Sequence, residues 1–271
     1  MYKYYKKKRI KRVFYNFDDP DQRTFRKSHH VLKKKIFKLS TIKDEFKNFY
    51  NCYYLNKIQQ LPLVDAKIAI SKDFYTINKN SKWITNLRSR KVGHLIRSKY
   101  DAIISTSKSI NKDNSLLNCR INGLNNSKPD LIIIDRNLKL KKNLKLLKIT
   151  KIRKTYIFTN KNDDKKISFF KKNNIKIIKI DRLKNKEDFL NLLKKIFKIG
   201  NRRVLIETGL VFLNQFFKFK LINNLHVFKS DKKLTKNGYN KISNDFIKKI
   251  RLKNKIYVNL KDEQLFKIRL K

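Results

Sequence analysis

Apolar residues follow two patterns along the chain: short β-branched runs, and longer stretches in which they recur every three or four positions. The short runs predict strands and the longer stretches predict amphipathic helices. From Leu61 onward the two patterns alternate. The predicted strands are Leu63 to Ala69, Ala102 to Ser105, Leu131 to Asp135, Thr155 to Phe158, Ile175 to Ile180, Arg203 to Glu207, Leu225 to Lys229 and Tyr257 to Leu260. The predicted helices are Leu87 to Arg97, Lys165 to Lys172, Glu187 to Lys198 and Leu210 to Phe217.

The alternation predicts an α/β fold with a mainly parallel sheet flanked by helices, and a ligand beyond the carboxyl ends of the strands. The first fifty residues predict a smaller α/β piece. It has a strand at Arg12 to Phe17, a turn at Asp18 to Asp21, and helices near Thr24 to Lys35 and Ile42 to Tyr54. So few elements bury too little apolar surface to be stable alone.

Charge favours two different interpretations. The chain has 70 Lys+Arg against 21 Asp+Glu, a formal net charge of +49, which is typical of nucleic-acid binding. However, the lysines are spread over the whole length, and the chain is rich in Lys, Asn, Ile, Phe and Tyr but holds only 5 Gly and 3 Pro. A genome that drifts toward A and T would give the same balance in any protein. Either origin predicts non-specific polyanion binding at low salt.

Other features limit the class of protein. The chain has two cysteines, Cys52 and Cys119, which do not form a recognisable disulfide pattern, and this favours a reducing cytoplasm. The chain has no apolar run long enough for a membrane span, and its basic N-terminus has no signal-peptide core. The four histidines have no Cys or acid at metal-ligand spacing, so we expect no metal site.

Four segments at strand ends or helix starts are candidates for chemistry. They are Lys67-Ile-Ala-Ile-Ser-Lys-Asp73, Ser81-Lys-Trp-Ile-Thr85, Ser105 through Arg120, and Val204-Leu-Ile-Glu-Thr-Gly-Leu210. Gly209 at a strand-to-helix turn would let a phosphate approach the free helix amides, although it could simply form a tight turn. Arg97 and Arg120 suit a phosphate oxyanion, although either could lie on a solvated face.

In this order, the four segments resemble the C-terminal reductase domain of the bifunctional riboflavin biosynthesis deaminase/reductase, a family with a dihydrofolate reductase-like fold. The family pattern is K-x-A-x-S-x-D-G, then S-x-W-I-T, a helix ending in arginine, G-x-x-T-x-x-x-D-x-P-x-L-x-x-R, and a strand ending in E-x-G. The match runs from about Leu61 to Gly238. Lys8 to Tyr15 and Asp18 to Asp21 look like the end of the family's zinc-dependent deaminase domain, whose H-x-E and P-C…C motifs are absent.

The resemblance implies two domains: residues 1–58 as a remnant of a cytidine deaminase-like domain, and residues 59–271 as an NADPH-dependent reductase. It implies reduction of 5-amino-6-(5-phosphoribosylamino)uracil to 5-amino-6-(5-phosphoribitylamino)uracil, without deaminase activity. It also implies a homodimer, with a separate deaminase as a candidate partner.

By the same resemblance, the implied catalytic residues are Lys67, Asp113 and Glu207. The implied substrate contacts are Ser81, Arg97, Leu117, Arg120 and Glu207. The implied NADPH contacts are Ala69, Trp83, Thr85, Ser109, Asp113, Arg136, Gly209, Leu210, Val211, Phe212, Leu213, Asn214 and Gln215.

The chain departs from the family pattern at several positions. Phe74 and Thr106 stand where the family has glycine, and Ser115 stands where it has proline. The glycine-rich run after Glu207 is reduced to Gly209. Two alternatives to a working reductase therefore stay open: a weakly active or inactive remnant, and a basic nucleic-acid-binding protein.

Overall fold

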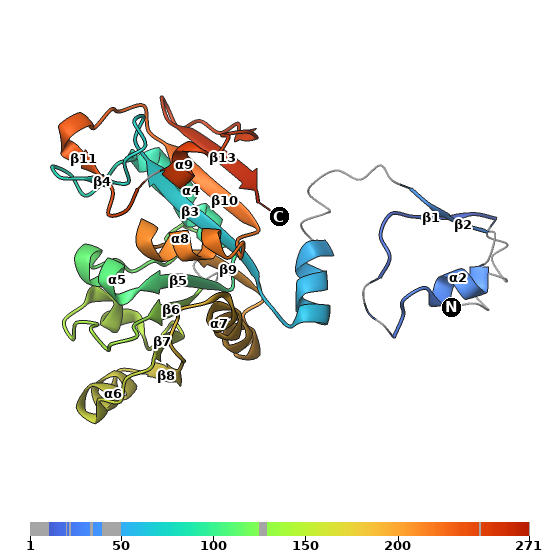
Figure 1. Ribbon diagram of the computed structural model, residues 1–271, viewed down its shortest axis with the longest axis horizontal. Coiled ribbons are helices and arrows are strands. Elements are labelled where there is room, and N and C mark those ends of the chain that lie inside the picture. The colour runs from blue at the N-terminus through green and yellow to red at the C-terminus, as the bar shows by residue number, and fades with distance from the viewer. Residues whose placement is uncertain are drawn as a thin grey trace. The chain divides into compact units, whose positions relative to one another are not determined.

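The computed structural model describes residues 11–19, 21, 23–32, 35–39, 50–124, 129–243 and 245–270. It divides the chain into two compact units, residues 1–63 with 194–202, and residues 64–193 with 203–271. Each unit is described by itself, and Figure 1 labels their elements. None of the helices in the described ranges is long and apolar enough to cross a membrane.

The N-terminal part of the first unit is a small α/β piece. Strand β1 (Val13–Tyr15) pairs in parallel with β2 (Ile36–Lys38), and helix α2 (Lys27–Leu32) lies between them in sequence. The predicted strand is confirmed, and the first predicted helix is shorter than expected. Most of the second, Ile42 to Tyr54, lies outside the described residues, which resume at Tyr50 in a helical segment that ends in the π-helical turn η2 (Leu55–Gln59).

A nine-stranded sheet has the strand order β12-β13-β10-β3-β9-β5-β6-β7-β8. Strands β5 to β8 pair in parallel, as do β5 with β9 and β3 with β10, whereas β13 runs antiparallel to β10 and to β12. The predicted mainly parallel sheet is confirmed. The strands are β3 (Leu63–Ile70), β5 (Ala102–Thr106), β6 (Asp130–Ile134), β7 (Thr155–Thr159), β8 (Ile175–Lys179), β9 (Arg203–Ile206), β10 (Asn224–Lys229), β12 (Lys255–Ile256) and β13 (Gln264–Arg269).

Helices flank this sheet, and all four helices predicted after Leu61 are confirmed. On one face, Ile96 of α4 packs with Ile103 and Leu205, and Ile110 of α5 packs with Leu131 and Ile157. Figure 1 shows α8 with α7 in front of the strands, and Phe189 of α7 contacts the rings of Phe212 and Phe216 in α8. The helices are α4 (Leu87–Arg97), α5 (Ser107–Asp113), α6 (Asp164–Lys172), α7 (Lys186–Lys198), α8 (Leu210–Lys218) and α9 (Asp245–Lys248), with the 3-10 turns η3 (Lys145–Ile149) and η4 (Thr235–Asn237).

The predicted strand at Tyr257 to Leu260 is wrong. Tyr257 is 90% exposed, and the C-terminal strand that joins the sheet is β13, whose Leu265, Phe266 and Ile268 are buried. Leu260 is buried beside the start of α4, where its carbonyl accepts a hydrogen bond from Asn86. The aromatic and β-branched character of Tyr257 and Val258 therefore reflects propensity without packing, which does not fix a strand.

A second, two-stranded sheet pairs β4 (Ile77–Asn78) with β11 (Gly238–Tyr239). The carboxylate of Asp73 ties the two segments together, since it accepts hydrogen bonds from the backbone amides of Leu234 and Thr235. At Gly238 the packing leaves no room for a side chain, because an added Cβ would lie 2.2 Å from the ring of Tyr75. The glycine is required there by close approach.

We expect Gly238→Ala to lower the free energy of unfolding by about 1–3 kcal/mol, since the ring of Tyr75 or the backbone must move. Gly93→Ala is the matched control: Gly93 lies within α4 and an added Cβ there meets nothing within 4 Å. The control should raise stability by up to about 1 kcal/mol, because alanine favours the helix. Chemical denaturation of both variants measures this, and equal effects would contradict the crowding at Gly238.

Left-handed backbone conformations are common at residues other than glycine. Eleven described non-glycine residues have positive φ, including Phe74 at 66°, which stands at the family's glycine position. Lys220 (φ 54°) follows the end of α8, where the amide of Leu221 bonds the Phe216 carbonyl and the amide of Lys220 bonds that of Phe217. This pair of hydrogen bonds is a Schellman ending, in which glycine normally holds the left-handed position.

Lys220→Gly should therefore raise the free energy of unfolding by about 1 kcal/mol, because the left-handed conformation penalises a side chain. Lys218→Gly, two residues earlier at the end of α8, is the control and should lower stability by about the same amount. Thermal unfolding distinguishes the two. A destabilised Lys220→Gly variant would show that the lysine side chain outweighs the backbone strain.

Candidate active site

The site is built around Glu207, the first residue after β9. Its amide donates to the Ile104 carbonyl at 2.9 Å, and its own carbonyl accepts from the hydroxyl of Ser105 at 2.7 Å. Both partners belong to β5, the neighbouring strand. The end of β9 is therefore fixed, and the Glu207 carboxylate has a defined position at the carboxyl edge of the sheet.

Two cations from other elements share this carboxylate. Arg97, the last residue of α4, binds it through two contacts, Nε to Oε1 at 2.6 Å and Nη2 to Oε2 at 2.9 Å. Lys67 of β3 places its Nζ 3.5 Å from Oε2. The exposed fractions of the side chains are 7% for Glu207, 14% for Arg97 and 22% for Lys67, so water screens these charges weakly.

Burial and charge act against each other at these groups. Burial alone would raise the pKa of Glu207, but Arg97 and Lys67 outweigh it and lower this pKa to about 2. Burial lowers the pKa of Lys67, Glu207 raises it in part, and Arg97 lowers it further. The cluster thus holds a firmly ionised carboxylate beside an ammonium that gives up its proton more readily than an ordinary lysine.

Arg120, the second predicted phosphate ligand, joins the cluster through His94. Nε2 of His94 lies 3.2 Å from Nη2 of Arg120, and Nδ1 of His94 lies 2.9 Å from the Asn118 carbonyl. Nη1 of Arg97 lies 3.4 Å from the same Nδ1 and 3.2 Å from the same carbonyl. Nothing in the sequence singles out His94, since it has no metal-ligand spacing.

Beside Glu207, three hydroxyl groups form a closed cluster at the start of α8. Thr106, Ser109 and Thr208 contact one another at 3.1 to 3.3 Å, and the Gly209 amide donates to the Ser109 hydroxyl at 3.3 Å. Within the part of the chain that the structure describes, no side chain caps the N-terminus of α8. An added Cβ at Gly209 would come no closer than 3.8 Å to Ser109, so packing within the chain does not explain this glycine.

The other predicted residues are spread over the neighbouring segments and do not form a further cluster with one another. Trp83 is 52% exposed and stacks at 4.3 Å under Arg90, and the hydroxyl of Ser81 accepts from the Trp83 amide. Asp113 ends α5, where its backbone carbonyl accepts from Lys82. Ala69 lies on β3, Thr85 on the segment before α4 and Leu117 on the loop after α5, and all three are half-buried. Arg136 is exposed and lies just after β6.

The predicted run along α8 divides by burial. Leu210 and Leu213 are buried in the core, at 4% and 0% exposed, and Phe212 packs against Phe189 and Phe216. Val211 is 48% exposed, and Asn214 and Gln215 are half-buried. Only the first-turn amides and the outward side chains of this run are therefore available to a ligand.

Arg153 anchors the loop that carries Leu117 and Arg120. It is 4% exposed and donates to the carbonyls of Leu116, Leu117, Pro129 and Asp130. The buried guanidinium thus binds the loop through its backbone. This residue, one of the 70 basic side chains, was missed from the sequence.

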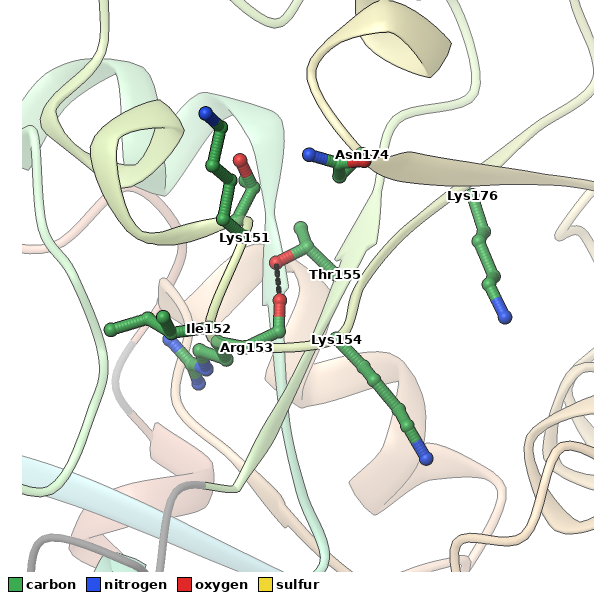
Figure 2. Close-up of a pocket in the computed structure, with 8 residues that line it drawn as sticks. Lys151, Ile152, Arg153, Lys154, Thr155, Asn174 and Lys176 are labelled. Carbon is green, nitrogen blue, oxygen red and sulfur yellow. Dashed lines mark hydrogen bonds between the residues drawn. The ribbon is translucent and has the colours of Figure 1, made fainter.

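Beside Arg153, a cavity of about 290 Å³ opens at the amino ends of β7 and β8. Figure 2 shows the ammonium groups of Lys151 and Lys154 pointing to opposite sides of it. The lysines do not converge on one point, and the cavity lies away from the carboxyl edge that holds Glu207. None of the described residues that line the cavity belongs to the Arg97–Glu207–Lys67 cluster.

The family model described as the RibD C-terminal domain matches residues 62–236. The chain belongs to this family. Its relatives include two riboflavin biosynthesis proteins RibD. That of Buchnera aphidicola is 28% identical over 236 residues, covering 81% of this chain and 62% of the relative; that of Aquifex aeolicus is 29% identical over 173 residues, covering 63% and 46%. This RibD-family chain thus spans about half to three fifths of their length.

Solved structures share the fold at lower identity. RibD from Acinetobacter baumannii matches with a TM-score of 0.73 at 18% identity, covering 99% of this chain and 75% of that chain. A diaminohydroxyphosphoribosylaminopyrimidine deaminase/5-amino-6-(5-phosphoribosylamino)uracil reductase from Thermotoga maritima matches with a TM-score of 0.71 at 18% identity, covering 99% and 74%. The dihydrofolate reductase-like architecture expected from the sequence agrees with these matches.

The low pKa of Glu207 makes the stability of this RibD-family chain depend on pH. The ordinary glutamate pKa is 4.5 and the folded-state value is about 2, so the ion cluster stabilises the fold fully above pH 4.5. This contribution, on the order of 3 kcal/mol, should disappear as the pH falls toward 2. Urea unfolding between pH 6 and about pH 3 measures it.

Glu207→Gln serves as the comparison, because glutamine cannot ionise. The variant should be less stable at pH 6, since Arg97 and Lys67 then lack their counter-ion, and its stability should change less between pH 6 and pH 3. A variant with the same pH slope as the natural chain would show that Glu207 does not couple to unfolding.

Proposed function

We propose that the chain is an NADPH-dependent reductase of riboflavin biosynthesis, which converts 5-amino-6-(5-phosphoribosylamino)uracil to 5-amino-6-(5-phosphoribitylamino)uracil. The observation that carries this proposal is the Arg97–Glu207–Lys67 cluster, whose Glu207 lies two residues before Gly209, the N-cap of α8. Membership in the RibD C-terminal domain family supports the reaction, as does the reductase activity for which the Thermotoga maritima relative is named.

The residues at the start of α8 suit a nicotinamide dinucleotide. Free helix amides and a glycine without an internal packing role suit close approach of a pyrophosphate. The hydroxyls of Thr106, Ser109 and Thr208 add hydrogen-bonding groups on the same side. We assign NADPH to this region, with Ala69, Trp83, Thr85, Asp113 and Arg136 as further proposed contacts.

The substrate would lie on the Glu207 side. A phosphate monoester suits the guanidinium groups of Arg97 and Arg120, with Ser81 and Leu117 as further contacts. The reaction breaks the bond between C1′ and the ring oxygen of the ribose, adds hydride to C1′ and adds a proton to the released oxygen. NADPH supplies the hydride when bound.

The proton can come from the protein. Lys67 Nζ is an ammonium of lowered pKa, held in place by Glu207, so it can donate a proton to the released oxygen. Glu207 ionises firmly and positions both cations. In this proposal Lys67 moves the proton and Glu207 orients the group that moves it, while the role of Asp113 stays with the cofactor.

The test is NADPH oxidation by the purified chain, with the phosphoribosylamino-pyrimidine supplied by upstream enzymes. Substrate-dependent oxidation at moderate salt is expected. Arg97→Ala should raise the substrate KM by about tenfold or more, because a charge-assisted contact is lost. Glu207→Gln should lower kcat strongly, because Lys67 loses its orienting partner.

Lys151→Ala is the matched control for loss of charge, since Lys151 lines the cavity shown in Figure 2 and is not a member of the Arg97–Glu207–Lys67 cluster. It should leave KM unchanged, whereas general attraction to a basic surface would make both variants equally weak. A folded chain that oxidises no NADPH would overturn the proposal and favour an inactive remnant. NADPH binding that is lost entirely at moderate salt would favour the alternative of a nucleic-acid-binding protein.

The proposals about partners rest on family resemblance alone. They are a homodimer and a separate deaminase that supplies the substrate. A cytoplasmic location is proposed from the cysteine content. We further propose that residues 1–58 derive from a deaminase domain and that the reductase domain spans residues 59–271. Non-specific polyanion binding at low salt stays a prediction from the charge of +49.

A further inference from the structure

His94 connects the two arginines that the proposed function assigns to the substrate phosphate. It lies on α4, three residues before Arg97, and its half-buried ring faces the loop that carries Arg120. Nη1 of Arg97 lies 3.4 Å from Nδ1, and Nη2 of Arg120 lies 3.2 Å from Nε2. The two guanidinium groups are therefore one imidazole ring apart, although they come from different elements.

One neutral tautomer satisfies the two strongest partners of this ring. Nδ1 lies 2.9 Å from the Asn118 carbonyl, which can only accept a hydrogen bond. Two donors also face Nδ1 at longer range, the backbone amide of Arg120 at 3.3 Å and Nη1 of Arg97 at 3.4 Å, so the shortest contact favours a proton on Nδ1. Nε2 then has a lone pair, which accepts from the guanidinium of Arg120. A second proton on the ring would place an N–H group against a guanidinium that has only donors.

Arg120 depends on this contact more than Arg97 does. Arg97 is held by two bonds to Glu207, whereas within the described ranges no carboxylate lies at ion-pair distance from the exposed Arg120. An unrestrained arginine loses side-chain entropy when it binds a ligand, and an acceptor that orders it beforehand reduces this loss. His94 is such an acceptor and brings no charge of its own.

The charges of the cluster specify the class of ligand. Lys67, Arg97 and Arg120 are cationic and Glu207 is the one carboxylate in the set, which leaves two positive charges uncompensated. A phosphate monoester carries close to two negative charges at neutral pH. We propose that His94 is a positioning residue, whose Nε2 orients Arg120 so that Arg97 and Arg120 bind one phosphate monoester together.

This inference deepens the proposed function, on which it rests, and direct binding tests it apart from turnover. The probe is ribose 5-phosphate, titrated calorimetrically into the full chain at moderate salt, with ribose as the unphosphorylated control. His94→Asn keeps a donor near Nδ1 and loses the acceptor at Nε2, so it should weaken binding of the phosphorylated sugar by about tenfold or more. His94→Gln, whose oxygen reaches the Nε2 position, should recover part of that loss.

A double-mutant cycle identifies the route of the effect. If His94 acts through Arg120, His94→Asn should have no further effect on binding in an Arg120→Ala background. In the enzyme assay, His94→Asn should raise KM and leave kcat nearly unchanged. A change confined to kcat or to the unfolding temperature would indicate a merely structural role and overturn the inference.

The remaining outcomes are distinct. Unchanged ribose 5-phosphate binding in His94→Asn would remove His94 from the phosphate site while the proposed reductase activity stands. A natural chain that reduces the full substrate but discriminates poorly between ribose 5-phosphate and ribose would place the phosphate contacts elsewhere, and again only this inference fails. A chain that neither binds the sugar phosphate nor oxidises NADPH would overturn both.

Discussion

A buried carboxylate that must be neutralised is the constraint on which the candidate site depends. Glu207 cannot stay ionised at 7% exposure without counter-ions, and Arg97 and Lys67 supply them from α4 and β3. Other buried acids join distant segments in the same way. Asp65 accepts from Tyr100 and Asn224, and Glu263 accepts from the amide that precedes α4. In a chain with so few acids, each of these buried ones organises a separate junction.

Burial on both faces explains why the sheet could be predicted. Strands such as β5, β6 and β9 are almost continuously apolar, which is typical of a parallel sheet covered by helices. The wrong prediction of the C-terminal strand, placed at Tyr257 to Leu260 and not at β13, has the opposite cause. In β13 the buried Leu265, Phe266 and Ile268 stand among lysine and arginine, and the long aliphatic stems of basic residues conceal the pattern. Helix α5 was missed because its start, capped by the Thr106 hydroxyl, has turn-like composition.

The site was predicted residue by residue through resemblance, and the structure adds the groups that connect these residues. Lys67, Arg97 and Glu207 came from separate motifs and form one ion cluster. His94 and Arg153 carry no motif. Their importance lies in hydrogen bonds to backbone carbonyls of a loop that is distant in sequence, and such contacts have no periodicity or spacing that a single sequence reveals.

The left-handed backbone at eleven described non-glycine residues has a consequence for the lifetime of the protein in a cell. Each such residue costs about 1 kcal/mol or more, less where asparagine occupies the position, against a typical total stability of about 5–15 kcal/mol. A chain with this many left-handed non-glycine residues therefore opens more often, and cellular proteases degrade opened chains. Ligands that bind only the folded form counter this by mass action. We expect the abundance of this protein in a cell to rise with the concentration of any ligand that binds its folded form.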